Sequence, residues 1–158
     1  MHKKGHIIVA FVLNFMFIYF TIYLGWKLFD LNEMNIFILT SIIILYSLMP
    51  DIDHRSAGIT WFFLGIGILG LLLGFGELAL KTGIFNPFFV LVWSVVFIIL
   101  VFISPNIFKH RGFIHSMIFG LLAVLPLFLL FESLSYCLVA YLSWHSHLIA
   151  DVIPFKVK

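Results

Sequence analysis

The chain has 158 residues, of which 63% are apolar and only 10% carry a formal charge, and its net charge is +2. This mixture lies far outside the composition of soluble domains and excludes water as the main solvent of the folded chain. The basic residues are thinly spread, so the sequence shows no patch for nucleic acid. Cys137 is the single cysteine, which excludes an internal disulfide and argues against a thiolate metal centre.

Six apolar runs follow one another along the chain. A bilayer span needs about 20 mostly apolar residues, and lipid offers no hydrogen-bond partners to an open backbone, so each run is predicted to be a helix. The connecting segments are short, which predicts one membrane-embedded domain over residues 1–158. The runs are Ile7 to Leu24, Asn35 to Met49, Ile59 to Ala79, Pro87 to Ile103, Phe113 to Phe131, and Leu134 to Ala150.

The first two runs carry signals at their ends. Basic residues precede the first run, as in a secretory signal peptide, but the segment from Thr21 to Trp26 has no small-x-small cleavage site. We therefore expect a retained first span. The second run is short for a full crossing, and Pro50 stops it because proline has no amide hydrogen and disfavours helix in the preceding residue.

The third run contains a glycine pattern. Gly65-x-Gly67-x-x-Gly70 matches the dinucleotide-binding fingerprint, but it lies within an apolar run and no strand precedes it. Close packing against another helix explains these glycines better, and Gly70 and Gly74 have the spacing typical of that role.

The basic residues also predict the orientation. If the N-terminus is inside, seven of the nine basic residues lie on the cytoplasmic side, and only Lys27 and Lys81 lie outside. Six spans return the C-terminus to the same side. The predicted fold class is therefore an all-α, polytopic membrane helix bundle of about six spans, with both termini cytoplasmic. All seven histidines and three of the acids, Asp51, Asp53 and Asp151, then lie at the inner face.

The segment after the second run is rich in potential metal ligands. Asp51, Asp53 and His54 follow the abrupt helix stop at Pro50. Two carboxylates and an imidazole so close together suit Zn²⁺ or Mn²⁺. A polar turn that caps the helix and meets lipid headgroups explains the same residues, so both interpretations stay open.

A second polar segment precedes the fifth run. Gly112 is expected to let His110 lie in the loop while His115 enters the first helical turn, so that two imidazoles face one ion. Arg111, between them, is suited to hold a phosphate or another anion by bidentate hydrogen bonds. The alternative is a basic membrane-proximal loop, which explains the cations but not the histidines.

The last run and the first run complete the candidate residues. His147 and Asp151 are four positions apart, so they share one helix face and can chelate one ion or form a plain hydrogen bond. Ionisable residues inside membranes are costly, which favours a functional role. His6 opens the first span on the same side, where an interfacial histidine is the alternative. His2 is terminal and His145 lies about 200° around the helix from His147, so both are left out.

Four motifs in this order resemble those of the YdjM-like, membrane-bound metal-dependent hydrolases: Gly5-His6, Pro50-Asp51-Ile52-Asp53-His54, His110-Arg111-Gly112-Phe113-x-His115-Ser116 and His147-Leu148-Ile149-Ala150-Asp151. That family is distantly similar to zinc-dependent phospholipases C and single-strand nucleases, which are helical enzymes with multinuclear zinc sites. The ligand positions implied by the resemblance are His6, Asp51, Asp53, His54, His110, His115, His147 and Asp151.

The function predicted on this basis is a membrane-bound metal-dependent hydrolase that holds two or three divalent ions, Zn²⁺ first and Mn²⁺ as the alternative, at the inner membrane face. A water acidified by the metal attacks a phosphoester, and location favours a lipid headgroup as substrate. Arg111 stabilises the charge that develops on the substrate oxygens, and Asp51 or Asp53 accepts the proton of the water.

Three rival functions use the same residues. A metal-binding transporter or sensor needs the same ligands, but transport also requires polar residues across the bilayer, and Asn14, Ser41, Ser94 and Ser143 do not make a path. A haem carrier needs histidines well inside the spans, whereas here they gather at the ends. A family member without catalytic activity also fits the sequence. The oligomeric state is not predicted.

Overall fold

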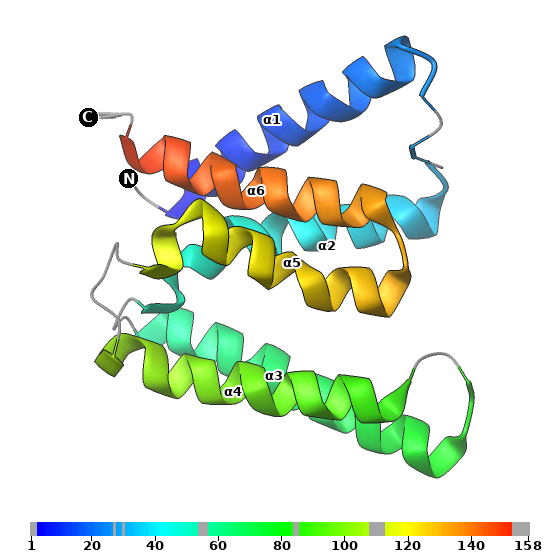
Figure 1. Ribbon diagram of the computed structural model, residues 1–158, viewed down its shortest axis with the longest axis vertical. Coiled ribbons are helices and arrows are strands. Elements are labelled where there is room, and N and C mark those ends of the chain that lie inside the picture. Colours follow the sequence, from blue (N-terminus) through cyan, green and yellow to red (C-terminus); the bar gives the residue numbers. More distant parts are fainter. Residues whose placement is uncertain are drawn as a thin grey trace. The chain divides into compact units, whose positions relative to one another are not determined.

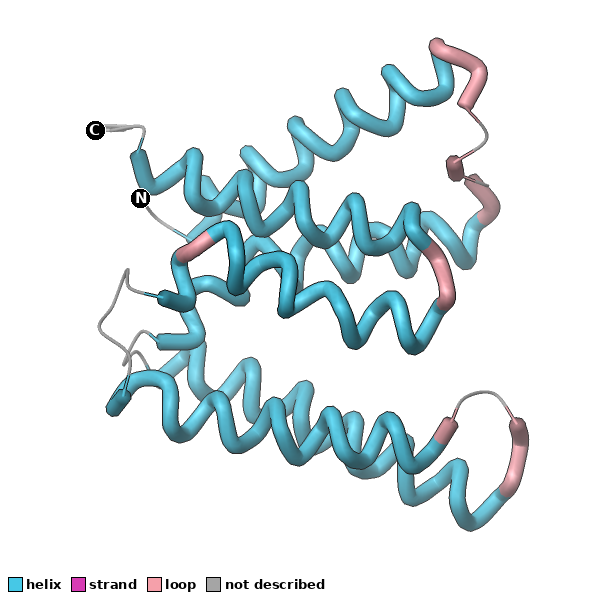
Figure 2. The backbone as a smooth tube through the Cα atoms, in the orientation of Figure 1, coloured by secondary structure: helices cyan, strands magenta, loops and turns pink. Residues whose placement is uncertain are grey.

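The computed structural model describes residues 3–26, 28–29, 31–53, 57–83, 86–107 and 113–152. This part of the chain consists of helices and connecting loops and contains no strand, which confirms the predicted all-α class (Figures 1 and 2). The helices are α1 (Lys3–Tyr23), α2 (Glu33–Leu48), α3 (Ala57–Leu80), α4 (Pro87–Ile107), α5 (Met117–Phe131) and α6 (Leu134–Val152). Two short 3-10 turns, η1 (Met49–Asp53) and η2 (Phe113–His115), precede α3 and α5.

Three helical segments within the described residues are long and apolar enough to cross a membrane: Gly5–Tyr23, Asn35–Ile52 and Thr60–Leu80. The apolar stretches Pro87–Ile103 and Met117–Phe131 are shorter. The six helices coincide with the six predicted runs, and the three long segments agree with a membrane protein. The full count of six spans stays a prediction.

The chain divides into two compact units. Unit 1 comprises residues 1–50 and 115–158 and holds α1, α2, α5 and α6, while unit 2 comprises residues 51–114 and holds α3 and α4. Whether the two units together form the predicted single domain over residues 1–158 is not tested by this division, so that domain stays a prediction.

Helix α6 is the centre of unit 1, because α1, α2 and α5 all pack against it. Trp144 of α6 is fully buried and lies against α5 at Gly120. A side-chain carbon added at Gly120 would meet the indole at 2.8 Å, so only glycine permits this close approach. The beginning of α1 and the end of α6 lie side by side, which brings the first and last parts of the described chain together (Figure 1).

In helix α1, polar and small residues are buried and large apolar residues are exposed, which is the reverse of the pattern in a soluble protein. Its buried positions are His6, Ala10, Asn14 and Thr21, which are small or polar. Its large apolar side chains point outward, and Phe15 for example is 71% exposed. This arrangement is the one expected of a helix that faces lipid.

The two helix ends that flank the polar segments show recognisable local chemistry. Helix α2 ends at Leu48 and the chain continues as the 3-10 turn η1, as expected from Pro50. Ser116 is the N-cap of α5, and its hydroxyl oxygen accepts a 3.1 Å hydrogen bond from the amide of Phe119. The placement of His115 in the first turn of that helix was therefore wrong: the cap fixes the helix start at Met117, and His115 lies in η2.

Unit 2 is a hairpin of α3 and α4. Gly70 packs closely on the Ser94 side chain. Gly74 packs on Leu91, so that an added side-chain carbon would lie only 2.7 Å from Cγ of Leu91. Gly65 has no such neighbour within 4 Å. The prediction that Gly70 and Gly74 allow close helix packing is confirmed.

Candidate metal centre

The last helix supplies two side chains of the centre. His147 and Asp151 lie one turn apart on α6, with His147 fully buried and the Asp151 side chain 15% exposed. Nε2 of His147 is 3.9 Å from Oδ2 of Asp151. This distance exceeds the hydrogen-bond range. The pair therefore does not form the plain hydrogen bond that the sequence analysis gave as the alternative to metal binding.

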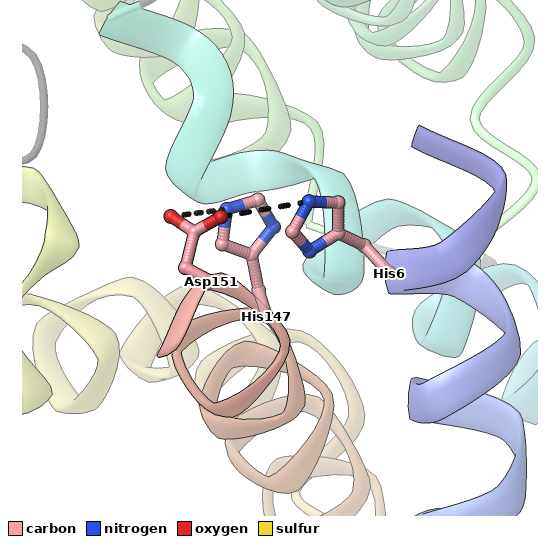
Figure 3. A group of neighbouring side chains, drawn as sticks. All are labelled: His6, His147 and Asp151. Carbon is pink, nitrogen blue, oxygen red and sulfur yellow. Dashed lines mark ion pairs between the residues drawn. The ribbon is translucent and has the colours of Figure 1, made fainter. Parts of the chain in front are cut away.

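The first helix supplies His6, which is buried against the same carboxylate. Nε2 of His6 lies 3.6 Å from Oδ1 of Asp151 (Figure 3). The rings of His6 and His147 are stacked, with centroids 4.1 Å apart and planes inclined by 14°. Each of the three residues offers one ligand atom, and these atoms all lie within 4.8 Å of one another.

The turn η2 supplies a third histidine. Nε2 of His115 lies 4.0 Å from Oδ2 of Asp151, and the His115 ring meets the His147 ring at 64° with centroids 5.4 Å apart. The side chain of His115 is only 5% exposed. One carboxylate of unit 1 thus faces three imidazoles, which come from α1, η2 and α6.

The donor set fits a divalent metal ion. Imidazole nitrogen and carboxylate oxygen are the ligands that Zn²⁺ prefers beside thiolate, and in a tetrahedral zinc site neighbouring ligand atoms lie about 3.3 Å apart. The three nitrogen-to-oxygen distances to Asp151 are 3.6, 3.9 and 4.0 Å, which is too long for hydrogen bonds and slightly wider than a closed zinc site. A small contraction around an ion would bring these atoms to ligand spacing.

The two oxygens of Asp151 serve different histidines. Oδ1 faces His6, whereas Oδ2 faces both His115 and His147. A carboxylate used on both sides can hold either one ion or two. A cation beside this nearly buried carboxylate is electrostatically favourable, because opposite charges attract more strongly away from water.

A backbone group that the sequence analysis missed orients one ligand. Nδ1 of His147 lies 2.7 Å from the carbonyl oxygen of Ser47 near the end of α2. A carbonyl only accepts, so the imidazole donates here and its Nε2 side is left to face Asp151. The only sequence signal for this contact was Pro50, three positions further on, which ends the helix.

A buried polar pair lies deeper in unit 1. Asn14 of α1 donates from Nδ2 to the hydroxyl oxygen of Ser143 on α6 at 2.9 Å and to the carbonyl of Ala10 at the same distance. Asn14 and Ser143 are completely buried. This contact joins the two helices that carry His6 and His147. Asn14 lies about two turns after His6, and Ser143 lies about one turn before His147.

Within unit 1, the structure brings together four of the eight predicted ligands, His6, His115, His147 and Asp151. Asp51 and Asp53 lie in the part of η1 that belongs to unit 2. The predicted residues His54, His110 and Arg111 lie outside the described residues.

The exclusion of His145 agrees with its position. Nδ1 of His145 lies 3.0 Å from the carbonyl oxygen of Tyr141 in its own helix, and the ring packs edge-on against Tyr141. His145 is thus engaged on another face of α6 than His147. His2 lies outside the described residues.

Comparisons of the chain with protein-family models, with curated proteins and with solved structures find no match. The resemblance to the YdjM-like hydrolases therefore stays a hypothesis that rests on the four motifs.

Proposed function

We propose that this protein is a membrane-bound metal-dependent hydrolase of the YdjM-like kind that cleaves a phosphoester at the inner face of the membrane. The observation that carries the proposal is the cluster of His6, His147 and Asp151, whose ligand atoms lie within 4.8 Å of one another. His115 faces the same carboxylate. Three imidazoles and one carboxylate gathered in a nearly buried place are the ligand types that divalent metal ions bind.

The proposed cofactor is Zn²⁺, with Mn²⁺ as the alternative, in two or three copies. When bound, such ions supply acidification of a water molecule and polarisation of a phosphoryl oxygen. In unit 1, His6, His115, His147 and Asp151 would hold the ions, and Asp151 has one oxygen for each side of the cluster. The remaining ligands proposed from the sequence are Asp51, Asp53, His54 and His110.

Two steps are assigned to other side chains. Arg111 would bind the non-bridging oxygens of the substrate and stabilise the charge that develops on them, because guanidinium groups match phosphate by paired hydrogen bonds. Asp51 or Asp53 would accept the proton released by the attacking water. These roles come from the sequence motifs, since Asp51 and Asp53 belong to unit 2 and Arg111 lies outside the described residues.

The proposed setting is a bundle of six spans with both termini and the metal cluster on the cytoplasmic side. Support comes from the basic residues, seven of which would lie inside, and from the three segments long enough to cross. A site at the membrane surface meets phospholipid headgroups at high local concentration. A lipid phosphoester is therefore the substrate that we favour, with nucleic acid not favoured as a partner.

The test is a hydrolysis assay on protein purified in detergent, stripped with a chelator and reloaded with Zn²⁺ or Mn²⁺. The substrates are a nitrophenyl phosphodiester and phospholipids in mixed micelles. We expect phosphate ester cleavage only after reloading, lost in His147→Ala and retained in His145→Ala, whose histidine bonds to its own helix instead. Metal-loaded protein that cleaves no phosphoester would reject the hydrolase and leave a metal-binding protein.

A metal transporter or sensor is the second candidate. The observation in its favour is the buried pair of Asn14 and Ser143, which places polar atoms deeper in unit 1 than the histidines. Transport would be detected as metal uptake into proteoliposomes that is abolished by His147→Ala, in the absence of any hydrolysis.

A further inference from the structure

The orientation of His147 depends on a single backbone acceptor. Nδ1 of His147 is 2.7 Å from the carbonyl oxygen of Ser47, and both residues are completely buried. Since a carbonyl oxygen has no hydrogen to donate, the hydrogen in this bond belongs to Nδ1. A neutral imidazole with its hydrogen on Nδ1 carries its lone pair on Nε2, which is the atom that faces Oδ2 of Asp151 at 3.9 Å.

The backbone near the Ser47 carbonyl lacks one amide hydrogen, at the residue three positions further on. In the 3-10 pattern that begins at Met49, the hydrogen bond to the Ser47 carbonyl would come from the amide of residue 50. That residue is Pro50, which has no amide hydrogen and is fully buried. The hydroxyl of Ser47 donates backward to the carbonyl of Ile44, so the backbone oxygen is the group that meets His147.

We infer that Pro50 and the Ser47 carbonyl are a positioning pair, which holds His147 as the tautomer with hydrogen on Nδ1 and presents Nε2 to the cluster. Pro50 acts by withholding an amide hydrogen, and the Ser47 carbonyl acts by accepting the one from His147. This inference rests on the proposed function in one respect: it takes Nε2 of His147 to be a metal ligand. The tautomer itself is a property of the metal-free protein.

His145 offers an internal reference in the same helix. Its Nδ1 also bonds to a carbonyl oxygen, that of Tyr141 at 3.0 Å, so it has the same tautomer. The acceptor of His145 belongs to α6 itself, four residues earlier, and does not depend on Pro50. A change at Pro50 should therefore alter the signals of His147 and leave those of His145 unchanged.

The first test is nitrogen NMR of metal-free protein labelled with ¹⁵N-histidine, at alkaline pH where imidazoles are neutral. The signals are assigned by their loss in His147→Gln and His145→Gln. We expect His147 to show a protonated Nδ1 and an unprotonated Nε2. Hydrogen on Nε2, alone or together with Nδ1, would overturn the inference whether or not the protein binds metal.

The second test compares Pro50→Ala with Pro126→Ala, which removes a proline from inside α5 in the same unit. In Pro50→Ala, the restored amide should compete with His147 for the Ser47 carbonyl and shift the His147 signals toward the other tautomer. Zn²⁺ binding should weaken about 10- to 100-fold, as it does when a metal ligand loses its outer hydrogen-bond partner. Pro126→Ala should do neither. Unchanged His147 signals and affinity in a folded Pro50→Ala protein would remove Pro50 from the pair. If the wild-type tautomer is as expected but no metal binds, the proposed function fails and the positioning pair stands.

Discussion

The imidazole of His6 stacks on that of His147, with ring centroids 4.1 Å apart, although the two residues lie near opposite ends of the chain. Both rings turn Nε2 toward Asp151, at 3.6 and 3.9 Å. The two rings and the carboxylate thus present three potential ligand atoms to one small volume. A cation shared by the three residues would account for this geometry.

His6→Ala should weaken Zn²⁺ binding by at least about 100-fold, because it removes a ligand rather than an outer-shell partner, whose loss costs about 10- to 100-fold. Competition against a zinc chelator of known affinity measures the effect. His145→Ala is the matched control, since His145 bonds to Tyr141 and should leave the affinity unchanged. Equal affinities of His6→Ala and wild type would remove His6 from the centre.

Metal should stabilise the fold of unit 1. A ligand that binds only the folded state contributes about 2.7 kcal/mol at a free concentration of 100 times its Kd. We therefore expect the thermal midpoint of the detergent-solubilised protein to fall after chelation and to recover when Zn²⁺ is added. The Asp151→Ala protein should show no such recovery, and a recovery equal to that of wild type would mean that zinc binds elsewhere.

Asn14 is expected to fix the register of α1 against α6, because it bonds to Ser143 two turns from His6. Asn14→Ala should destabilise the protein by about 1 kcal/mol, in the range of hydrogen bonds between membrane helices, and should also weaken Zn²⁺ binding through His6. Ser41→Ala is the control: Ser41 is exposed, and its hydroxyl donates to the carbonyl of Phe37 in its own helix. If zinc affinity is unaffected in a destabilised Asn14→Ala protein, Asn14 has no part in aligning the site.

The hairpin of unit 2 is expected to tolerate alanine at one glycine and not at another. A side-chain carbon at Gly74 would lie 2.7 Å from Cγ of Leu91, whereas one at Gly76 has no neighbour within 4 Å. Gly74→Ala should cost about 1–3 kcal/mol from overpacking. Gly76→Ala should be neutral, or stabilising by up to about 1 kcal/mol from helix propensity. Thermal midpoints of the two variants decide this, and a Gly74→Ala protein as stable as Gly76→Ala would contradict the packing.

The helices were predictable from the sequence because lipid leaves few choices. Long apolar runs must be helical where no water can bond to the backbone, and the six runs match the six helices within a few residues at most boundaries. The start of α5 was missed because the cap formed by Ser116 overrides the apolar pattern that begins at Phe113. Caps depend on a single side-chain bond, which hydropathy does not report.

The site was predictable only for residues that are close to one another in sequence or that lie at the same face of the membrane. His147 and Asp151 are one turn apart, so their proximity follows from helix geometry. The placement of His6 beside them depends on how α1 packs on α6, for which the sequence gives only the common inner face. Only Pro50 pointed toward the contact with Ser47, because the acceptor is a backbone carbonyl, which every residue type carries.

The central claim is that His6, His147 and Asp151 hold a metal ion, and elemental mass spectrometry of the detergent-purified protein tests it most directly. Wild type and a His147→Ala, Asp151→Ala double variant are compared after equal exposure to Zn²⁺ and Mn²⁺, with His145→Ala as the folded control. We predict about two or more equivalents of metal in wild type and in His145→Ala, and loss of that metal in the double variant. No metal in wild type, or the same metal content in the double variant, would contradict the metal centre.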